Sequence, residues 1–319
     1  MPKVSVIVPV YNAEKTLIPC LGNLVHQTLE DIEIILVNDC STDGSFKIMQ
    51  DCESQFPEKV ILIDLEENLG PGGARNVGLM YASGEYIGFV DSDDLADTSM
   101  YEKMYKCAIE GNYDIVDCGF LNEKEDIAIL LTTDERCGDI TAKTRNELVA
   151  DCGYLWSSIF RKELWEGVQF REHVSLEDFE TVILMFLKAD RVGTVKEILY
   201  RYKNQDGSLS KLREPYKYHK TIVGALEAII DCVMPNERYS EACEAVEYVA
   251  ARLAASDIAV AMHNEKNIGN EAKNRHVKET TILLSRIVAH PLEHNQFVKK
   301  KMKQLDIDCI KACYESFIM

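Results

Sequence analysis

Residues 4–118 alternate between short runs of mostly apolar residues, without a strict apolar/polar alternation, and segments with helical spacing, and this pattern restricts the fold more than any other feature. Apolar residues that continue along a run, and do not alternate with polar ones, indicate burial on both faces, which is typical of a mainly parallel sheet covered by helices on both sides. The predicted strands are residues 4–10, 32–37, 60–65, 86–90 and 114–118. The predicted helices are residues 16–27, 73–81 and 100–109. The sequence therefore indicates an α/β fold, in which ligands bind beyond the carboxyl ends of the strands.

The composition is that of an ordinary globular protein with room for two domains. Of the 319 residues, 46% are hydrophobic and 28% are charged, and a chain of this length buries about three quarters of its unfolded surface. The 35 basic and 53 acidic residues give a formal net charge of −18, which argues against nucleic acid as a partner. The 11 cysteines include no C-x-x-C pair, which favours reduced thiols over a disulfide framework or a zinc site.

No segment of the sequence predicts a membrane span. An apolar run such as residues 181–187 is far shorter than the roughly 18 to 20 residues that cross a bilayer. The apolar run at residues 4–10 is followed by Tyr11 and Asn12 and not by a small-residue cleavage site, so we predict a strand here and not a signal peptide. We therefore expect a cytoplasmic protein.

The remainder of the chain is weakly patterned at first and then helical. The elements expected up to residue 202 are an irregular segment at 121–150 that leads into a helix near 145–150, a helix at 177–188, and short strands at 191–195 and 197–202. From about residue 216 the apolar spacing is almost purely helical. We predict a first domain of residues 1–214 and a helical C-terminal subdomain of residues 215–319.

An acidic cluster follows the fourth predicted strand. Asp91, Asp93 and Asp94 stand at the end of a buried run, where neighbouring carboxylates repel one another and lose hydration. Oxygen ligands of this kind suit Mg²⁺ or Mn²⁺ shared with substrate phosphates. A solvated acidic turn that caps the next helix is the alternative interpretation of an isolated D-x-D.

Polar and aromatic residues also follow the first three predicted strands. Tyr11 and Asp39 stand at neighbouring strand ends, where an aromatic face and an acidic acceptor suit a nucleobase. Asp43, in a Ser-Thr-Asp-Gly turn, is better explained as a helix cap. The glycine-rich segment 68–79 opens a helix, so its backbone amides can approach an anion, and Arg75 adds a positive charge.

Taken in order, these segments resemble the family 2 inverting glycosyltransferases. The segments that carry the resemblance are V-S-V-I-V-P-V-Y-N at 4–12, N-D-C-S-T-D-G-S at 38–45, the glycine-rich segment at 68–79, D-S-D at 91–93 and a glutamate-aspartate pair at 177–178. The resemblance covers about residues 3–211, whereas residues 215–319 match no family that we can name. It implies the A-type glycosyltransferase fold, a mainly parallel twisted sheet flanked by helices, here with a helical C-terminal region.

The resemblance also implies roles for individual residues. Asp178 falls at the position of the general base, with Glu177 beside it, and Asp93 at the position that binds Mn²⁺ or Mg²⁺ on the donor diphosphate. The residues implied for binding the nucleotide sugar are Pro9, Tyr11, Asp39, Asn68, Arg75 and Asp91. Arg201 and residues 203–208 suit a lid over the diphosphate, with an ordinary surface turn as the alternative.

The function that follows is transfer of one sugar, with inversion, from a nucleotide donor, most simply UDP-linked. The implied acceptor is a glycan or a lipid-linked molecule in surface polysaccharide biosynthesis. Two alternatives stay open: a sugar nucleotidyltransferase, and a non-catalytic module that binds a glycan or a partner on the same scaffold. Residues 299–303, rich in lysine, suit either a solvated helix face or peripheral contact with anionic lipid at the inner face of the membrane. No pattern predicts an oligomeric state.

Overall fold

A computed structural model describes residues 1–151, 154–203, 214–263, 270–288 and 292–318. The chain forms two compact units, one of residues 1–140 and 153–205 and the other of residues 141–152 and 206–319. Helix α5 (Ala142–Ala150) therefore belongs to the same unit as the C-terminal helices. A folding boundary at residue 214 stays a prediction.

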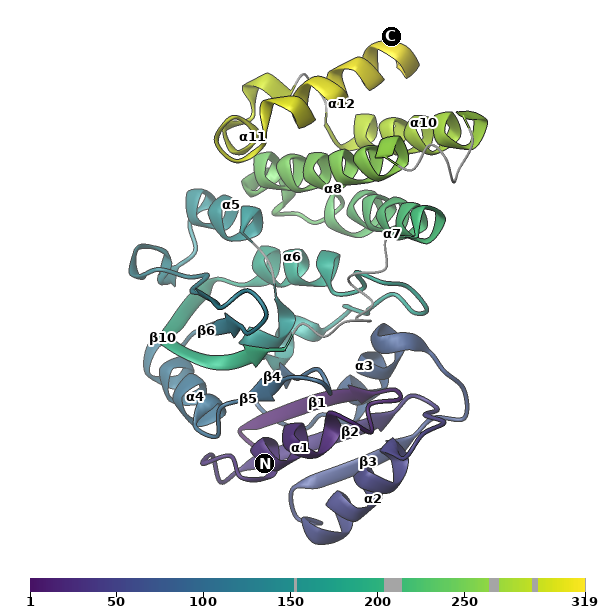
Figure 1. The fold of residues 1–319 in the computed structure, drawn as a ribbon. Coiled ribbons are helices and arrows are strands. Elements are labelled where there is room, and N and C mark those ends of the chain that lie inside the picture. The colour runs from purple at the N-terminus through teal and green to yellow at the C-terminus, as the bar shows by residue number, and fades with distance from the viewer. Residues whose placement is uncertain (152–153, 204–213, 264–269, 289–291, 319) are drawn as a thin grey trace. The chain divides into compact units, whose positions relative to one another are not determined.

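The first unit is built on one sheet, to which ten strands of the described residues contribute (Figure 1). Its order is β3-β2-β1-β4-β9-β6-β10-β5, with β7 beside β6 and β8 beside β10. The strands are β1 (Val4–Val10), β2 (Ile32–Asn38), β3 (Val60–Asp64), β4 (Tyr86–Phe89), β5 (Leu95–Ala96), β6 (Ile115–Asn122), β7 (Ile127–Ile129), β8 (Gly138–Asp139), β9 (Ser158–Arg161) and β10 (Arg191–Tyr202). Strands β1 to β4, β6 and β10 point one way, because antiparallel β9 lies between β4 and β6. The predicted mainly parallel sheet is confirmed.

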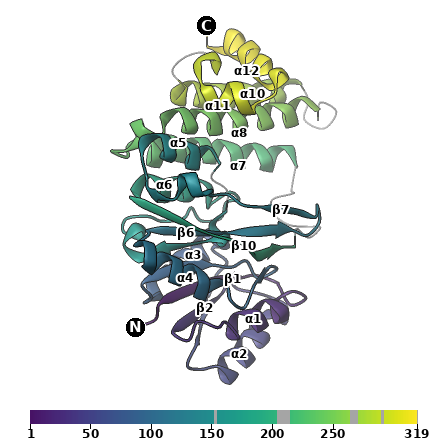
Figure 2. The same ribbon diagram turned by 90° about the vertical axis from the view of Figure 1, so that its left-hand side faces the viewer.

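Helices cover both faces of this sheet (Figure 2). They are α1 (Leu17–Val25), α2 (Ser45–Gln55), α3 (Gly70–Tyr81), α4 (Met100–Gly111) and α6 (Phe179–Lys188). Val6 and Val8 of β1 share one buried core with apolar residues of α1, α2 and α4. On the opposite face α3 packs directly on β1, where a Cβ at Gly78 would lie 2.4 Å from Ile7. This close approach is possible only because residue 78 has no side chain.

Three sequence-based expectations were wrong in detail. The two strands expected at 191–195 and 197–202 are one strand, β10, whose pairing with β6 shifts register between Val195 and Ile198. The segment expected to be irregular at 121–150 contains β7 and β8. Strand β9 was not expected, because four residues are too few to show a hydrophobic period.

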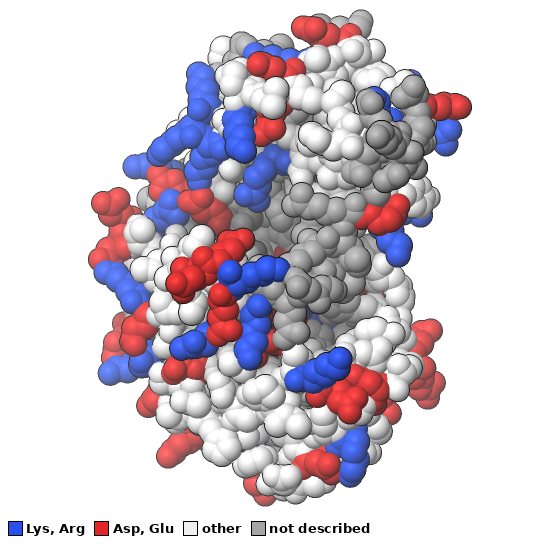
Figure 3. All heavy atoms as spheres, in the orientation of Figure 1, with Lys and Arg blue, Asp and Glu red and all other residues white. Residues whose placement is uncertain are grey.

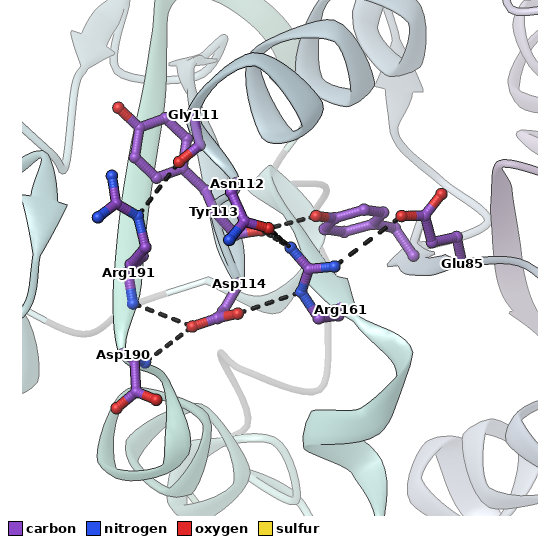
Figure 4. Close-up of polar contacts among 9 residues, drawn as sticks. Glu85, Gly111, Asn112, Tyr113, Asp114, Arg161, Asp190 and Arg191 are labelled. Carbon is purple, nitrogen blue, oxygen red and sulfur yellow. Dashed lines mark hydrogen bonds and ion pairs between the residues drawn. The ribbon is translucent and has the colours of Figure 1, made fainter.

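The amino ends of the central strands are joined by the carboxylate of Asp114, which precedes β6 (Figure 4). It accepts hydrogen bonds from Arg161 Nε at 3.1 Å and from the backbone N–H groups of Asp190 and Arg191 at 2.8 and 3.0 Å. The Arg161 guanidinium also lies 5.1 Å from the ring centroid of Tyr86, at the start of β4. These contacts fix the relative positions of β4, β6, β9 and β10 at the edge opposite to the carboxyl ends.

The second unit is helical, as predicted for the C-terminal region. Besides α5 it contains α7 (Pro215–Ala228), α8 (Cys243–His263), α10 (Asn270–Ile287), α11 (Gln296–Lys301) and α12 (Gln304–Phe317). Within the described residues, none of the helices combines the length and the apolarity needed to cross a bilayer.

A buried polar network joins three of these helices. His219 of α7 contacts Asp257 of α8 at 2.8 Å through Nδ1 and Glu279 of α10 at 3.2 Å through Nε2. The ring of His276 stacks on it at 4.0 Å. Burial alone would lower the pKa of His219, but the hydrogen bonds and charges of the two carboxylates raise it above its usual value. The network therefore favours the protonated ring.

We expect the contribution of His219 to stability to decrease with rising pH. A raised pKa in the folded state gives a contribution that is complete below the unfolded pKa of about 6.5 and is lost as the pH rises through the folded value. His219→Gln should therefore lower the free energy of unfolding by about 1–3 kcal/mol at pH 6.5 and by less at pH 8.5.

Urea unfolding of both proteins at the two pH values measures this difference. Burial and the charge of His219 lower the pKa of His276 below its usual value of about 6.5, so His276 titrates below the range from pH 6.5 to pH 8.5. His263→Gln, at an exposed position of α8, is the control. A difference between wild type and His219→Gln that stays constant or grows with pH would contradict the assignment.

Candidate active site

The ends of β1 and β2 are linked by a set of loop hydrogen bonds. Asn12, at a positive φ of 51°, accepts a hydrogen bond from the backbone N–H of Thr42 at 2.8 Å. Asp43 accepts hydrogen bonds from the N–H groups of Ser45 and Glu14 at 3.0 and 3.1 Å, so it contacts the first residue of α2, although the N-cap residue is Gly44 and not Asp43 as expected. Tyr11 is 53% exposed beside this loop, and Pro9 lies partly buried in β1. An open aromatic face therefore borders the carboxyl ends of β1 and β2.

Asp39 connects the end of β2 to the glycine-rich segment. Its carboxylate accepts a hydrogen bond from Leu69 N–H at 2.7 Å, and its backbone carbonyl accepts one from the side chain of Asn68 at 3.0 Å. Burial raises the pKa of this carboxyl, although backbone hydrogen bonds from Leu69 and Gly70 oppose the shift. Two residues predicted to contact the nucleotide, Asp39 and Asn68, are thus in direct contact.

Arg75 of α3 is the centre of the polar cluster. Its side chain is only 6% exposed, and Nη2 donates to Asp91 Oδ1 at 2.9 Å while Nη1 donates to Glu177 Oε1. The guanidinium also lies 5.7 Å from the ring centroid of Phe170. Burial alone would lower the pKa of Arg75, and the carboxylates of Glu177, Asp91 and Asp178 more than offset this, so the group stays charged. The cation predicted to face an anion therefore already compensates two carboxylates.

Glu177 and Asp178 lie directly before α6. Glu177 is 7% exposed and bonds Arg75, whereas Asp178 occupies the N-cap position without making a capping hydrogen bond through its side chain. Helix α6 thus begins at Phe179, two residues later than the sequence predicted. Burial and the negative charge of Glu177 raise the pKa of Asp178 well above the usual range, and Arg75 only partly opposes them. Asp178 is therefore a carboxyl group with a raised pKa at the start of α6, and its side chain does not cap the helix.

The start of α3 is clamped onto the segment that carries these acids. Asn76 donates to the carbonyl of Phe170 at 2.9 Å and accepts from its N–H at 2.8 Å. A Cβ at Gly72 would lie 2.0 Å from the carbonyl oxygen of Arg171, a distance that atoms do not tolerate. Contact at this distance requires glycine. The clamp sets the position of Glu177 relative to Arg75.

The acidic cluster after β4 has three different environments. Asp91 bonds Arg75, whereas Asp94 is fully buried and accepts from Tyr200 OH and Lys203 N–H, each at 2.9 Å. Burial, followed by the charges of its neighbouring aspartates, raises the pKa of Asp94. Asp94 therefore has a structural role, because its hydrogen bonds join the end of β10 to the loop after β4.

Asp93 lacks such compensation. Across the described part of the chain, no other side chain donates a hydrogen bond or forms an ion pair with its carboxylate. Burial and the charge of Asp91 raise its pKa, which only Lys203 and its own backbone oppose. The described residues contain no preformed group of three His, Cys, Asp or Glu side chains able to hold a metal ion. A cation at Asp93 would therefore take most of its ligands from a bound molecule or from water.

Arg201 makes no ion pair with the residues of this cluster, all of which the structure describes. It is on β10, its side chain is 60% exposed, and its ion-pair partner is Glu123 at 3.5 Å. The predicted lid begins at Lys203, whose backbone bonds Asp94, and continues through residues 204–208, which lie outside the described residues. Its role as a lid stays a prediction.

No role was predicted for Asn76, Tyr200 or Gly72. Asn76 directly follows Arg75 in the glycine-rich segment, so its place in that motif was the available signal. Tyr200 stacks on Trp156 with ring centroids 4.3 Å apart and donates to Asp94. This pairing joins segments far apart in the chain, and nothing in a single sequence indicates it.

Comparison with known proteins identifies similar chains and a shared fold. Residues 5–164 match the family model described as glycosyl transferase family 2. The chain is 34% identical over 230 residues to the uncharacterized glycosyltransferase EpsJ of Bacillus subtilis, covering 68% of this chain and 65% of EpsJ. It is 30% identical over 219 residues to the minor teichoic acid biosynthesis protein GgaB of the same organism, covering 64% of this chain and 23% of GgaB. The match thus spans less than two thirds of either relative.

A solved structure shares the fold. Residues 1–349 of TarS from S. aureus, in complex with UDP-GlcNAc, superpose with a TM-score of 0.72 at 22% identity, covering 99% of this chain and 91% of that one. The similarity confirms the predicted A-type glycosyltransferase fold.

We expect Gly72→Ala to destabilise the first unit. The added methyl group would overlap the Arg171 carbonyl, and overpacking of this kind costs about 1–3 kcal/mol. Gly22→Ala in α1 is the matched control, since its Cβ would meet nothing within 4 Å. That change should stabilise the helix by about 0.5–1 kcal/mol. Urea unfolding measures both, and equal effects of the two substitutions would refute the proposed clamp.

Proposed function

Because the chain belongs to glycosyl transferase family 2, we propose that it transfers a single sugar from a UDP-linked donor to an acceptor hydroxyl, with inversion at the anomeric carbon. The observation that carries this proposal is the carboxylate of Asp178, which has a raised pKa and makes no capping hydrogen bond. It belongs to one cluster with Arg75, Glu177 and Asp91. A raised pKa suits a group that takes a proton near neutral pH.

The donor site is proposed at the carboxyl ends of β1, β2 and β4. Tyr11 is exposed for stacking on the base, with Pro9 beside it, and Asn68 is exposed where it bonds the backbone of Asp39, which is itself only 2% exposed. Asp91 is available for the ribose, because its side chain is 31% exposed although one oxygen bonds Arg75. The choice of UDP is supported by the fold shared with TarS, whose structure contains UDP-GlcNAc.

Asp93 fits a divalent cation by its chemistry. It is a half-buried carboxylate beside a second carboxylate, its pKa is raised although the charge of Lys203 opposes the shift, and no described side chain forms a hydrogen bond or ion pair with it; Mn²⁺ and Mg²⁺ favour such oxygen ligands. When bound, the ion would stabilise negative charge on the leaving diphosphate.

Transfer then requires few groups of the protein. Asp178 accepts the proton of the acceptor hydroxyl, whose oxygen forms a bond to the anomeric carbon as the bond to the diphosphate breaks and its electrons remain on the diphosphate. General-base action of this kind contributes roughly 10²- to 10⁴-fold in rate. Arg75 holds Glu177 and Asp91 in place and keeps their charges compensated, and Glu177 raises the basicity of Asp178. Arg75 is thus a positioning residue, and a direct contact of Arg75 with diphosphate is not needed.

We propose a surface glycan or a lipid-linked molecule as the acceptor. The support is the similarity to GgaB, which is named for the biosynthesis of teichoic acid. The cytoplasmic location expected from the sequence is retained as part of the proposal.

We expect UDP to stabilise the protein in a manner that depends on Mn²⁺ or Mg²⁺. A ligand at 100 times its Kd adds about 2.7 kcal/mol to stability, which shifts the Tm by several degrees. Thermal unfolding with UDP, GDP, CDP or dTDP, with and without metal, measures this. Asp93→Ala should abolish the metal-dependent part, and Asp51→Ala, at an exposed position of α2, should not. A shift by UDP that is equal with and without metal would remove the role of Asp93. No shift with any nucleotide would favour a non-catalytic binding module.

We expect Asp178→Asn to lower kcat at least about 10²-fold while the Kd for UDP changes less than about twofold. The amide keeps the shape of the carboxylate and cannot accept the proton. In the wild type, the acid limb of kcat/KM should lie above the usual aspartate pKa of about 3.9, because burial and Glu177 raise the pKa of Asp178. Hydrolysis and transfer assays with the donor across pH test both points. A variant that keeps half of the wild-type activity would contradict the assignment.

A further inference from the structure

A pocket of about 320 Å³ lies within the second unit, between α8 and the segment that joins α11 to α12. Its charged lining residues are Arg252, Lys301, Lys303 and Asp306. The volume is at the lower end of the range for small-molecule sites. The pocket therefore has room for one small ligand and a surplus of positive charge.

This surplus contrasts with the rest of the protein. The chain carries a formal net charge of −18, yet three basic residues face one acidic residue in this pocket. Lys and Arg side chains also gather at the upper left of the surface in Figure 3, where Figure 1 draws α11. A local concentration of cations in a concave site attracts anions even when the whole molecule is acidic.

Aromatic rings hold two of the cations in place. The guanidinium of Arg252 lies 5.9 Å from the ring centroid of Tyr248, and Nζ of Lys301 lies 5.8 Å from the same centroid. Lys301 also lies 5.7 Å from the ring of Phe297. Tyr248 is only 5% exposed and lines the pocket, so its ring is a buried support for the two charged groups. Attraction to the face of the ring favours these positions of the two charged groups.

The cations differ in how they are compensated. Lys301 bonds the carboxylate of Asp151. Arg252 and Lys303 form neither a hydrogen bond through their side chains nor an ion pair with any residue that the structure describes. Arg252 and Lys303 are therefore available to a ligand, and guanidinium with ammonium is the combination that binds phosphate oxygens.

We infer that this pocket binds a phosphate group carried by a small organic molecule. Arg252 and Lys303 bind the phosphate oxygens, and Tyr248, Ala255 and Met302 contact the organic part. A concave site for a discrete ligand is favoured over a flat contact with a membrane, because the two cations line a cavity. The inference does not rest on the proposed transfer reaction, since no residue of the donor site lines the pocket.

Isothermal titration of the full chain with sn-glycerol 3-phosphate, and separately with inorganic phosphate, tests the inference at constant ionic strength set with sodium chloride. We expect saturable 1:1 binding of glycerol 3-phosphate. Arg252→Gln and Lys303→Gln should each weaken it about tenfold, as expected for loss of a charged hydrogen bond. Lys299→Gln, which removes the same charge from an exposed position outside the pocket, should change the Kd less than about twofold.

Two controls distinguish loss of this site from misfolding and from loss of the donor site. Far-UV circular dichroism checks that each variant folds. If Arg252→Gln does not fold, Lys303→Gln is the deciding variant. UDP binding measured on the same samples should stay unchanged, because the donor residues lie outside the pocket. Equal weakening by Lys299→Gln and Arg252→Gln would overturn the inference. Binding only to vesicles of phosphatidylglycerol and phosphatidylcholine, with none to either phosphate, would also overturn it.

Discussion

The buried guanidinium of Arg75 lies between the carboxylates of Asp91, which follows β4, and Glu177, which precedes α6. Arg75 and Glu177 are buried and Asp91 is partly exposed, and loss of one member of such a cluster leaves an uncompensated charge away from water. Three segments that are distant in the chain are therefore held together at one end of the sheet. The position of Asp178, next to Glu177, follows from this contact.

The backbone around Arg75 is arranged so that this contact can form. Asn76 pairs with both polar groups of Phe170, Gly72 admits the carbonyl of Arg171, and Asp39 holds Leu69 at the start of α3. Apart from Asp39, these contacts involve amide groups and a glycine and no additional charged side chain. The helix that carries Arg75 is thus fixed from both sides, so the charged cluster does not depend on ion pairs alone.

The two ends of the sheet illustrate how similar residues serve different purposes. At the amino ends, Asp114 is compensated by Arg161 and by two backbone N–H groups. At the carboxyl ends, Asp93 has no hydrogen-bond or ion-pair partner among the described side chains, and Asp178 has its pKa raised by burial and by Glu177. Perturbed carboxylates at the ligand-binding edge of an α/β sheet are typical of a functional site. The contrast supports a structural role for the first set and a chemical role for the second.

The sequence by itself determined the α/β class, the direction of the main strands and the end of the sheet at which polar residues gather, because continuous apolar runs and the residues after them are local signals. The ordered motifs also indicated the family. Only the tertiary structure decided that Arg75 compensates Asp91 and Glu177, that Asp94 is bound by Tyr200, and that β9 lies between β4 and β6. Arg75 and Glu177 are 102 positions apart in the chain, and Asp94 and Tyr200 are 106 apart. No local pattern records which distant partner a side chain meets when the chain packs, and a strand of four residues is too short to show its period.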